Sequence, residues 1–264
     1  MMALRRTNDL FVTLVLWVYF ILGFLILYFP RYLIGFLPRE KRELRYQRLH
    51  HLFFRRFFSL VRFLIPSLSF KIDPGVNGIQ SAVIVCNHLS YLDPLLLISQ
   101  YEWQKTIAKS TFFRVPVFGW LIKQSGYVPA AGKGVSAWHV AEHILGLGVY
   151  LKTGGNVFVF PEGTRSRTGK IADLAGGAFE IAKRSNAPVK VLFVENTDML
   201  FKPGTFLFNT AIRQPIQLRL IASLDPDYSD PDFSVDTMMG EVKALFETET
   251  SRAQEKTKQR IANQ

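Results

Sequence analysis

One uninterrupted apolar run near the amino end constrains this sequence more than any other feature. The stretch Leu10–Phe29 is apolar except for Thr13 and contains no charged residue. About twenty such residues are what a helix needs to cross the hydrocarbon core of a bilayer. The run is longer than the apolar centre of a secretory signal and lacks a small-residue cleavage site, so it predicts a retained membrane anchor.

The orientation of this anchor is not fixed by the charges around it. Arg5 and Arg6 precede the run, and a second basic stretch begins after Pro38. Because positive charge flanks both ends, the rule that positive loops stay in the cytoplasm does not decide between them. Two arrangements remain open, a helix that spans the membrane and a helical hairpin that dips into one leaflet.

The second basic stretch, residues 39–62, predicts an amphipathic helix that ends near Pro66. Its apolar face would lie in the headgroup layer, or the helix would pack on the domain that follows it in the sequence and have a solvated basic face. The apolar positions are Leu49, Phe53, Phe57, Leu60 and Leu64, and the basic ones are Arg39, Lys41, Arg42, Arg45, Arg48, Arg55, Arg56 and Arg62.

Charge and cysteine content limit the kinds of partner and site that this chain can have. Residues 1–73 hold 12 of the 32 Lys and Arg residues but only 4 of the 21 Asp and Glu residues, so most of the +11 net charge lies there. This basic segment is interleaved with Leu and Phe, which favours a lipid surface and argues against nucleic acid. The single cysteine, Cys86, excludes an intrachain disulfide, and no Cys/His cluster suggests a metal site.

After residue 82, short β-branched runs alternate with helical stretches. This alternation predicts an α/β fold with a central mixed sheet flanked by helices. The apolar run before it adds the N-terminal membrane-embedded segment, for which a helical hairpin is one of the two open arrangements. We expect a membrane anchor and basic helix over 1–66, a catalytic domain over 67–235 and a C-terminal surface helix over 236–264. The expected strands are Ala82–Cys86, Thr106–Ala108, Asn156–Phe160, Val189–Val194 and Ile216–Ile221, and the expected helices are Pro94–Gln100, Val135–Lys152 and Ala175–Ser185.

A histidine and an aspartate follow the first predicted strand. His88 leaves the end of that strand and Asp93 comes five residues later. If Ser90 caps the next helix and Asp93 lies in its first turn, the carboxylate returns to one imidazole nitrogen. The other nitrogen then faces substrate, as a general base requires. The alternative is that Asp93 only caps the helix and His88 is an ordinary strand-end histidine.

A second motif follows the strand at 156–160. Its sequence is Pro-Glu-Gly-Thr-Arg, residues 161–165, with Arg167 and Lys170 close behind. A guanidinium in such a turn can bind a phosphate through two parallel bonds, and the Gly163 backbone can approach a ligand closely. The alternative for this segment is a solvated basic turn.

Together the two motifs resemble the glycerolipid acyltransferase family that includes 1-acylglycerol-3-phosphate acyltransferases. They are Asn87-His88-x-x-x-x-Asp93 and Phe160-Pro161-Glu162-Gly163-Thr164-Arg165, about seventy residues apart. The resemblance implies that His88 is the general base and that Asp93 orients it. It also implies that Glu162, Gly163 and Arg165 bind the acceptor's phosphate. We include Asn87, Ser90, Thr164 and Lys109 among the expected substrate-binding residues.

The sequence departs from this family at two places. Gly132 stands where many members carry an Arg, with Lys133 beside it, and Val191 stands where a Pro is usual. A lysine offers a point charge in place of a planar fork, which leaves two interpretations: the phosphate is held less rigidly, or the acceptor has a different head group.

The resulting expectation is a membrane-bound O-acyltransferase that moves a fatty acyl group from a thioester to a lysophospholipid hydroxyl. The thioester of coenzyme A or acyl carrier protein is a co-substrate, and no cofactor, metal or nucleic acid is expected. We place the protein at the inner (cytoplasmic) membrane with its catalytic domain facing the cytoplasm. The alternatives are transfer to another lysolipid, such as a lyso-aminolipid, and a catalytically silent membrane tether.

Overall fold

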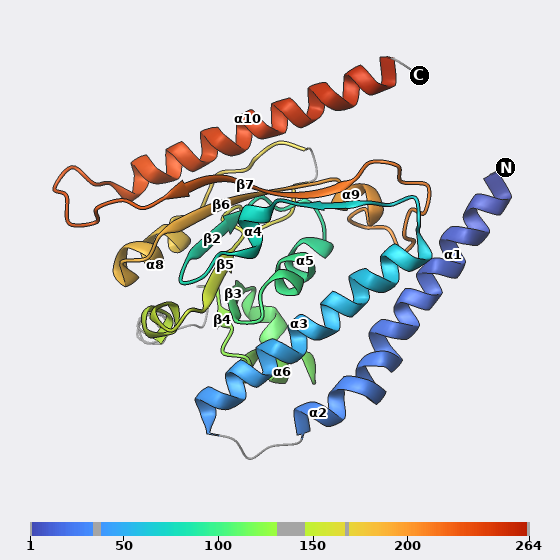
Figure 1. Cartoon of the computed structure of the whole chain (residues 1–264), viewed down its shortest axis with the longest axis horizontal. Coiled ribbons are helices and arrows are strands. Elements are labelled where there is room, and N and C mark those ends of the chain that lie inside the picture. Colours follow the sequence, from blue (N-terminus) through green and yellow to red (C-terminus); the bar gives the residue numbers. More distant parts are fainter. Residues whose placement is uncertain (1, 34–37, 131–145, 167–168, 263–264) are drawn as a thin grey trace.

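The centre of the protein is a seven-stranded mixed sheet (Figure 1). The structure is a computed structural model that describes residues 2–33, 38–130, 146–166 and 169–262. Strand order is β1-β7-β6-β2-β5-β3-β4; β7 is antiparallel to β6, and the other pairings are parallel. The strands are β1 Phe70–Ile72, β2 Val83–Cys86, β3 Gln104–Ala108, β4 Val128–Pro129, β5 Asn156–Val159, β6 Val189–Glu195 and β7 Ile216–Leu224.

All five predicted strands are confirmed. β2, β5 and β6 are runs rich in β-branched and aromatic residues that the sheet buries, whereas β3 and β7 are only partly buried. Every residue of β2 and β5 is buried, which accounts for their continuous apolar sequence at the middle of the sheet. β1 and β4 were not predicted. They contain three and two residues and lie at the two edges, so they carry little pattern of their own.

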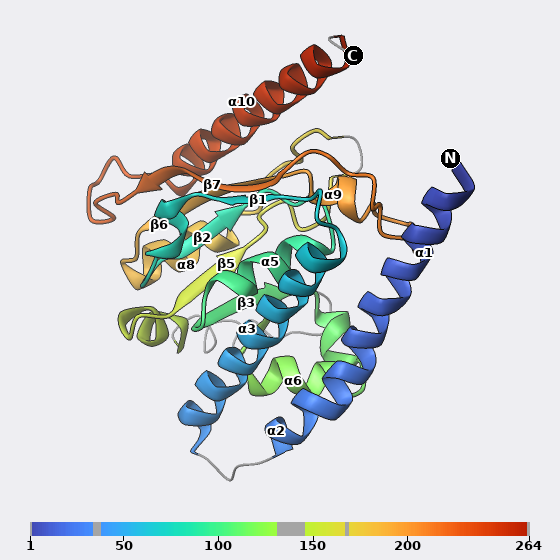
Figure 2. The same ribbon diagram turned by 45° about the vertical axis from the view of Figure 1, so that its right-hand side comes forward.

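Helices cover both faces of the sheet (Figure 2). The predicted helix at 135–152 is helical over 146–152, and the rest of it lies outside the described residues. The labelled helices are α1 Met2–Val18, the π-helical η1 Tyr19–Tyr28, α2 Phe29–Leu33, α3 Arg39–Leu64, α4 Pro74–Asn77, α5 Leu92–Gln100, the 3₁₀ turn η2 Ser110–Arg114, α6 Phe118–Gln124, α8 Gly177–Ser185, α9 Thr197–Leu200 and α10 Val235–Ala262.

α1, η1 and α2 follow one another without a break and form one long helical rod, the N-terminal rod (Figures 1 and 2). Its segment Arg5–Leu33 is long and apolar enough to cross a membrane, and only 17% of the most apolar window is buried. One side of the rod exposes a stripe of large apolar side chains at helical spacing. The stripe contains Leu10, Leu14, Val18, Ile21, Leu22, Leu25 and Ile26.

α3 runs back beside the rod and completes a helical hairpin. The hydroxyl of Tyr19 donates to the carbonyl of Phe53, and the hydroxyl of Tyr46 donates to the carbonyl of Tyr32. The apolar run itself therefore does not fold back within its length; the hairpin has the rod as one arm and the basic helix as the other.

The apolar face of α3 is buried inside the protein. Phe53, Phe57 and Val61 lie in the same core as Leu96 and Leu97 of α5. A helix that uses its apolar face in this way cannot also lay that face into the headgroup layer. Of the two predicted arrangements, the structure therefore has α3 packed on the catalytic domain.

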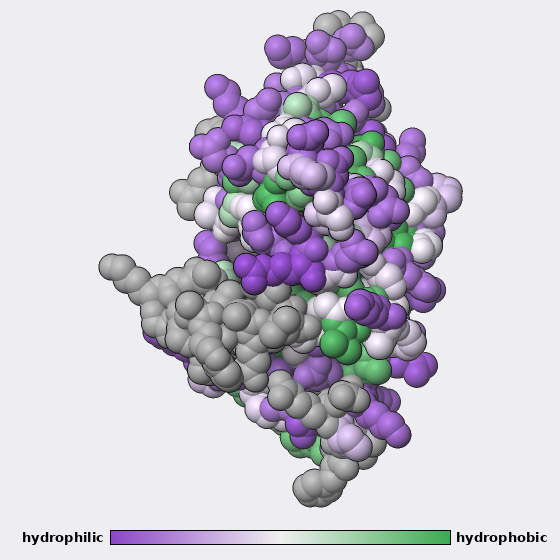
Figure 3. All heavy atoms as spheres, turned by 90° about the vertical axis from the view of Figure 1, so that its left-hand side faces the viewer, coloured by the Kyte–Doolittle hydropathy of each residue, from purple (hydrophilic) through white to green (hydrophobic). Residues whose placement is uncertain are grey.

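The C-terminal helix α10 is only partly a surface helix. Met238, Val242 and Phe246 on its first half are buried against the sheet face that also carries α8. Beyond Glu249 its described side chains are largely exposed. The side of the molecule turned away from the N-terminal rod is mostly hydrophilic, with hydrophobic side chains only in small groups (Figure 3).

Candidate active site

The predicted site residues gather at the edge of the sheet formed by the carboxyl ends of its parallel strands. β2 and β5 pair in parallel, so the segments that follow Cys86 and Val159 leave the sheet side by side. β6 pairs in parallel with β2 on its other side and brings in the turn that begins α9. The carboxyl ends of parallel strands are where open α/β folds build their sites.

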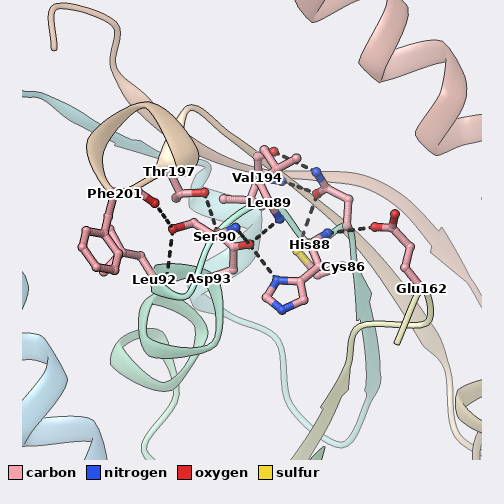
Figure 4. Close-up of polar contacts among 11 residues, drawn as sticks. Cys86, His88, Leu89, Ser90, Leu92, Asp93, Glu162, Val194, Thr197 and Phe201 are labelled. Carbon is pink, nitrogen blue, oxygen red and sulfur yellow. Dashed lines mark hydrogen bonds and ion pairs between the residues drawn. The ribbon is translucent and has the colours of Figure 1, made fainter. Parts of the chain in front are cut away.

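His88 and Asp93 form the hydrogen-bonded pair that their spacing predicts. His88 Nδ1 lies 2.9 Å from Asp93 Oδ2, with Asp93 buried in the first turn of α5 (Figure 4). An ionised carboxylate only accepts hydrogen bonds, so this geometry suits the neutral tautomer in which Nδ1 donates to Asp93 and Nε2 has the lone pair. The imidazole stacks on Phe160 with ring centroids 4.2 Å apart, which fixes its plane.

Asp93 is held by a set of donors from two parts of the chain. Its Oδ2 also accepts the backbone N–H groups of Leu89 and Ser90, at 2.6 and 2.7 Å. Its Oδ1 accepts the hydroxyl of Thr197, the first residue of α9 (Figure 4). Thr197 is fully buried. Thr197 was not predicted, because nothing in its local sequence marks it and only the fold brings it to Asp93.

Glu162 connects the two motif loops. One of its carboxylate oxygens accepts the backbone N–H of His88 at 2.9 Å, and the other accepts that of Ala172 at 3.2 Å. The His88 carbonyl in turn accepts the N–H of Ser166. Burial raises the pKa of the Glu162 carboxyl, with these N–H groups opposing the shift. Glu162 thus fixes the backbone of His88, and its expected contact with the acceptor's phosphate stays a prediction.

Arg165 lies across the ring of Tyr91. Its guanidinium carbon is 3.4 Å from the ring centroid, close enough for a stacked cation–π contact. Its buried Nη1 has no hydrogen-bond partner among the described residues. A guanidinium held by one face, with a donor left unmatched, is suited to receive an anionic group.

Two predicted substrate-binding residues have their side chains engaged inside the protein. The buried amide of Asn87 donates to the carbonyl of Val194 at 3.0 Å and accepts its N–H at 2.7 Å. The buried hydroxyl of Ser90 donates to the Phe201 carbonyl and accepts the N–H of Leu92. These bonds use both side chains to hold the loops, and the expected part of Asn87 and Ser90 in substrate binding stays a prediction.

The remaining predicted residues lie at the surface or outside the described part of the chain. Gly163, Thr164 and Lys109 are exposed, and Gly163 has φ +65°, a conformation that favours glycine. Gly132 and Lys133 lie outside the described residues. Val191 is buried in β6 opposite Val85. Within the described residues no group of three or more His, Cys, Asp or Glu side chains could hold a metal ion.

Known proteins share both the sequence and the fold of this region. Residues 74–194 match the family model described as Acyltransferase. A chloroplastic 1-acyl-sn-glycerol-3-phosphate acyltransferase of Brassica napus is 31% identical over 165 residues, which are 61% of this chain and 47% of that protein. The enzyme of that name from Saccharomyces cerevisiae is 33% identical over 131 residues, 48% of this chain and 43% of that protein.

A solved structure has the same fold over nearly the whole chain. The crystal structure of the 1-acyl-sn-glycerophosphate (LPA) acyltransferase PlsC from Thermotoga maritima superposes with a TM-score of 0.69 at 23% identity, covering 95% of this chain and 98% of that one. The chain spans about half the length of the chloroplastic and yeast relatives. Its two motifs and the sheet edge that they share lie within residues 74–194, and this part of the chain is an acyltransferase domain of that family.

Proposed function

We propose that this protein is a membrane-bound O-acyltransferase of the 1-acylglycerol-3-phosphate acyltransferase type. It moves a fatty acyl group from a thioester to a lysophospholipid hydroxyl. The observation that carries the proposal is the pair formed by His88 and Asp93, in which Nδ1 is bonded to the carboxylate and Nε2 is left to accept a proton. The relatives from Brassica napus and Saccharomyces cerevisiae, both 1-acyl-sn-glycerol-3-phosphate acyltransferases, support the substrate class.

The reaction needs one proton to move twice. The acceptor hydroxyl gives its proton to His88 Nε2 as its oxygen attacks the thioester carbonyl, and the buried carboxylate of Asp93 stabilises the imidazolium that forms. The tetrahedral intermediate then collapses, the carbon–sulfur bond breaks, and the departing thiolate takes the proton back. The products are the acylated lipid and a free thiol. Both coenzyme A and acyl carrier protein supply such a thioester.

The acceptor's head group binds at Arg165. This guanidinium lies near the same sheet edge, because Ser166 donates to the His88 carbonyl and Tyr91 follows His88 by three residues. A phosphate there would match the unpaired Nη1. The sequence departures at Gly132 and Val191 favour a second candidate, a lysolipid with another head group such as a lyso-aminolipid. Assays with the two acceptor classes side by side distinguish them.

The N-terminal rod attaches the protein to one leaflet. Polar contacts dock its first turns on the catalytic domain, because Asp9 accepts from Thr210 and Thr13 accepts the N–H of Phe208. Its last turns dock on α3. A rod held along its length leaves only its outer apolar stripe for lipid, so it dips into the bilayer without crossing it. We place it in the inner membrane with the site facing the cytoplasm.

Activity of purified variants tests the catalytic proposal. We expect His88→Ala to lower the transfer rate by roughly 10²–10⁴, the usual loss on removing a general base, with folding and membrane binding unchanged. Asp93→Asn should also be impaired, and Asp173→Asn, at an exposed carboxylate, is the control. A His88→Ala protein with normal turnover would refute the mechanism. A wild-type protein inactive with every lysolipid and both thioesters would indicate the silent tether.

Extraction of membranes tests the attachment. Salt screens headgroup attraction but does not reverse apolar insertion, so the full protein should stay with the membrane in a high-salt wash. Release by salt alone would show that the rod is not inserted.

A further inference from the structure

A second cluster of exposed apolar side chains lies outside the N-terminal rod, in the segment formed by η2 and α6. We call residues 110–124 the η2–α6 segment. Its exposed members include three aromatic rings, and a run of exposed large apolar residues is unusual on a surface that faces water. They are Phe112, Val115, Val117, Phe118 and Trp120, each between 37% and 47% exposed.

The backbone of this segment holds these side chains outward. Val117 has φ +61°, a conformation that costs a β-branched residue energy and persists only where its surroundings enforce it. Gly119 packs so closely that an added Cβ would lie 2.5 Å from the Phe113 carbonyl oxygen. Leu121 and Ile122, on the other side of α6, are buried. The exposed rings therefore belong to a fixed surface.

The segment adjoins the rod. The ring of Trp120 contacts the ring of Phe29 at 6.5 Å between centroids and that of Tyr46 at 5.7 Å. Both views place α6 beside the hairpin (Figures 1 and 2). The segment therefore packs through Trp120 against the end of the rod and the first half of α3.

Its charges match an anionic lipid surface. Lys109, Arg114 and Lys123 are exposed, and residues 109–124 contain no Asp or Glu. Aromatic rings surrounded by cations are the composition found where proteins meet lipid headgroups. The segment also follows the carboxyl end of β3. Because β3, β5 and β2 run parallel, this is the same end of the sheet as the one that carries His88.

We propose that the η2–α6 segment is a second membrane-contacting segment, which inserts its apolar side chains among the headgroups of an anionic bilayer beside the rod. The proposal rests on the membrane attachment proposed above and goes beyond it. With contacts at both the rod and this segment, the domain cannot rotate about the rod axis. The sheet edge with His88 is then held at the bilayer surface, where a lysolipid lies.

Fluorescent labels at single cysteines test this in the full-length protein. Cys86 is the only cysteine and is buried, so an introduced cysteine can be labelled alone. We choose Phe118→Cys for the segment, Ile26→Cys for the rod and Val149→Cys as a control. Val149 is 68% exposed and belongs to the helix over residues 146–152. This helix is the yellow-green one in Figure 1, on the side of the sheet away from the rod. Each variant carries an NBD label and is bound to phosphatidylglycerol-containing vesicles.

Two quenchers then report the position of each label. We expect nitroxide-labelled lipid to quench positions 118 and 26 at least twofold more than position 149, and aqueous iodide to quench position 149 most. In vesicles of phosphatidylcholine alone, the lipid quenching at 118 should fall and that at 26 should remain. If iodide reaches 118 as readily as 149 while 26 is protected, the segment faces water or another protein and the inference fails. If 26 is also accessible, the membrane attachment itself fails.

Discussion

The hydroxyl of Thr197 donates to Oδ1 of Asp93, which lies 104 residues earlier in the chain. This bond uses the carboxylate oxygen that the loop of residues 88–90 leaves free, since Oδ2 accepts from His88, Leu89 and Ser90. The orientation of His88, the proposed base, therefore depends on the start of α9 as well as on the loop that carries it.

Removing this hydroxyl should reduce turnover. A hydrogen bond to a charged group contributes about 1.5–3 kcal/mol, so Thr197→Val, which keeps the shape, should lower kcat by roughly tenfold or more. The Michaelis constants should change little, and the pH profile of kcat should shift, because the charge of Asp93 acts on His88. Thr197→Ser should restore most of the rate. Equal loss in Ser and Val variants would point to the methyl group's packing instead.

The Michaelis constants of Arg165 variants should show whether this residue binds the acceptor or the donor. Arg165→Lys keeps the charge but loses the planar fork and its stacking on Tyr91, so we expect the Michaelis constant for the acceptor to rise and that for the thioester to stay. Tyr91→Leu should give a smaller rise of the same kind, whereas Tyr91→Phe should be near normal. An effect confined to the thioester would place Arg165 against the donor and move the acceptor pocket elsewhere.

Asn87 should matter for stability more than for binding. Asn87→Asp removes the amide that donates to the Val194 carbonyl and puts a carboxylate oxygen against it in a buried position. We expect a loss of about 2–4 kcal/mol in the free energy of unfolding, measured by urea in detergent. Asn77→Asp, at an exposed position on α4, is the matched control. A variant as stable as wild type would contradict the assigned bonds.

Acid should loosen the hairpin. Full burial lowers the pKa of His50 on α3 from 6.5 to about 4, in a site formed by Ser125, Tyr127 and Tyr32. Between these pH values the unfolded chain binds this proton and the folded protein does not. The contribution of His50 to the free energy of unfolding is therefore full above pH 6.5 and is lost as the pH falls to 4. The loss is about 3 kcal/mol at most. The slope of unfolding free energy against pH should be flatter in His50→Gln.

The sequence predicted most of the sheet and the central pair of the site, for physical reasons. Buried parallel strands such as β2 and β5 are continuous apolar runs. The spacing of five residues between His88 and Asp93 places His88 at the end of a strand and Asp93 in the first turn of the next helix. Both signals are local. What the sequence missed depends on pairs far apart, such as Thr197 with Asp93, or on very short edge strands such as β4.

The position of α3 shows a further limit of sequence reasoning. Its alternation of Phe and Arg fits a lipid surface as well as a protein surface, because both bury an apolar stripe. Only the fold decides between them, because it sets the rings of Tyr19 and Phe20 in the rod against Phe53. On another side of α3, it sets His51 against the Ile98 carbonyl of α5. A single sequence does not contain that information locally.

The hydrogen bond between the His88 N–H and Glu162 limits how the acceptor specificity of this protein can change. The backbone of His88 is fixed through its N–H by Glu162 and through its carbonyl by Ser166, on the two sides of Arg165. The loop that would hold the head group and the loop that carries the base thus form one rigid unit. Evolution or design toward a new acceptor would have to exchange both loops together, since a swap of the residues 161–166 alone would displace the base as well as the head-group site.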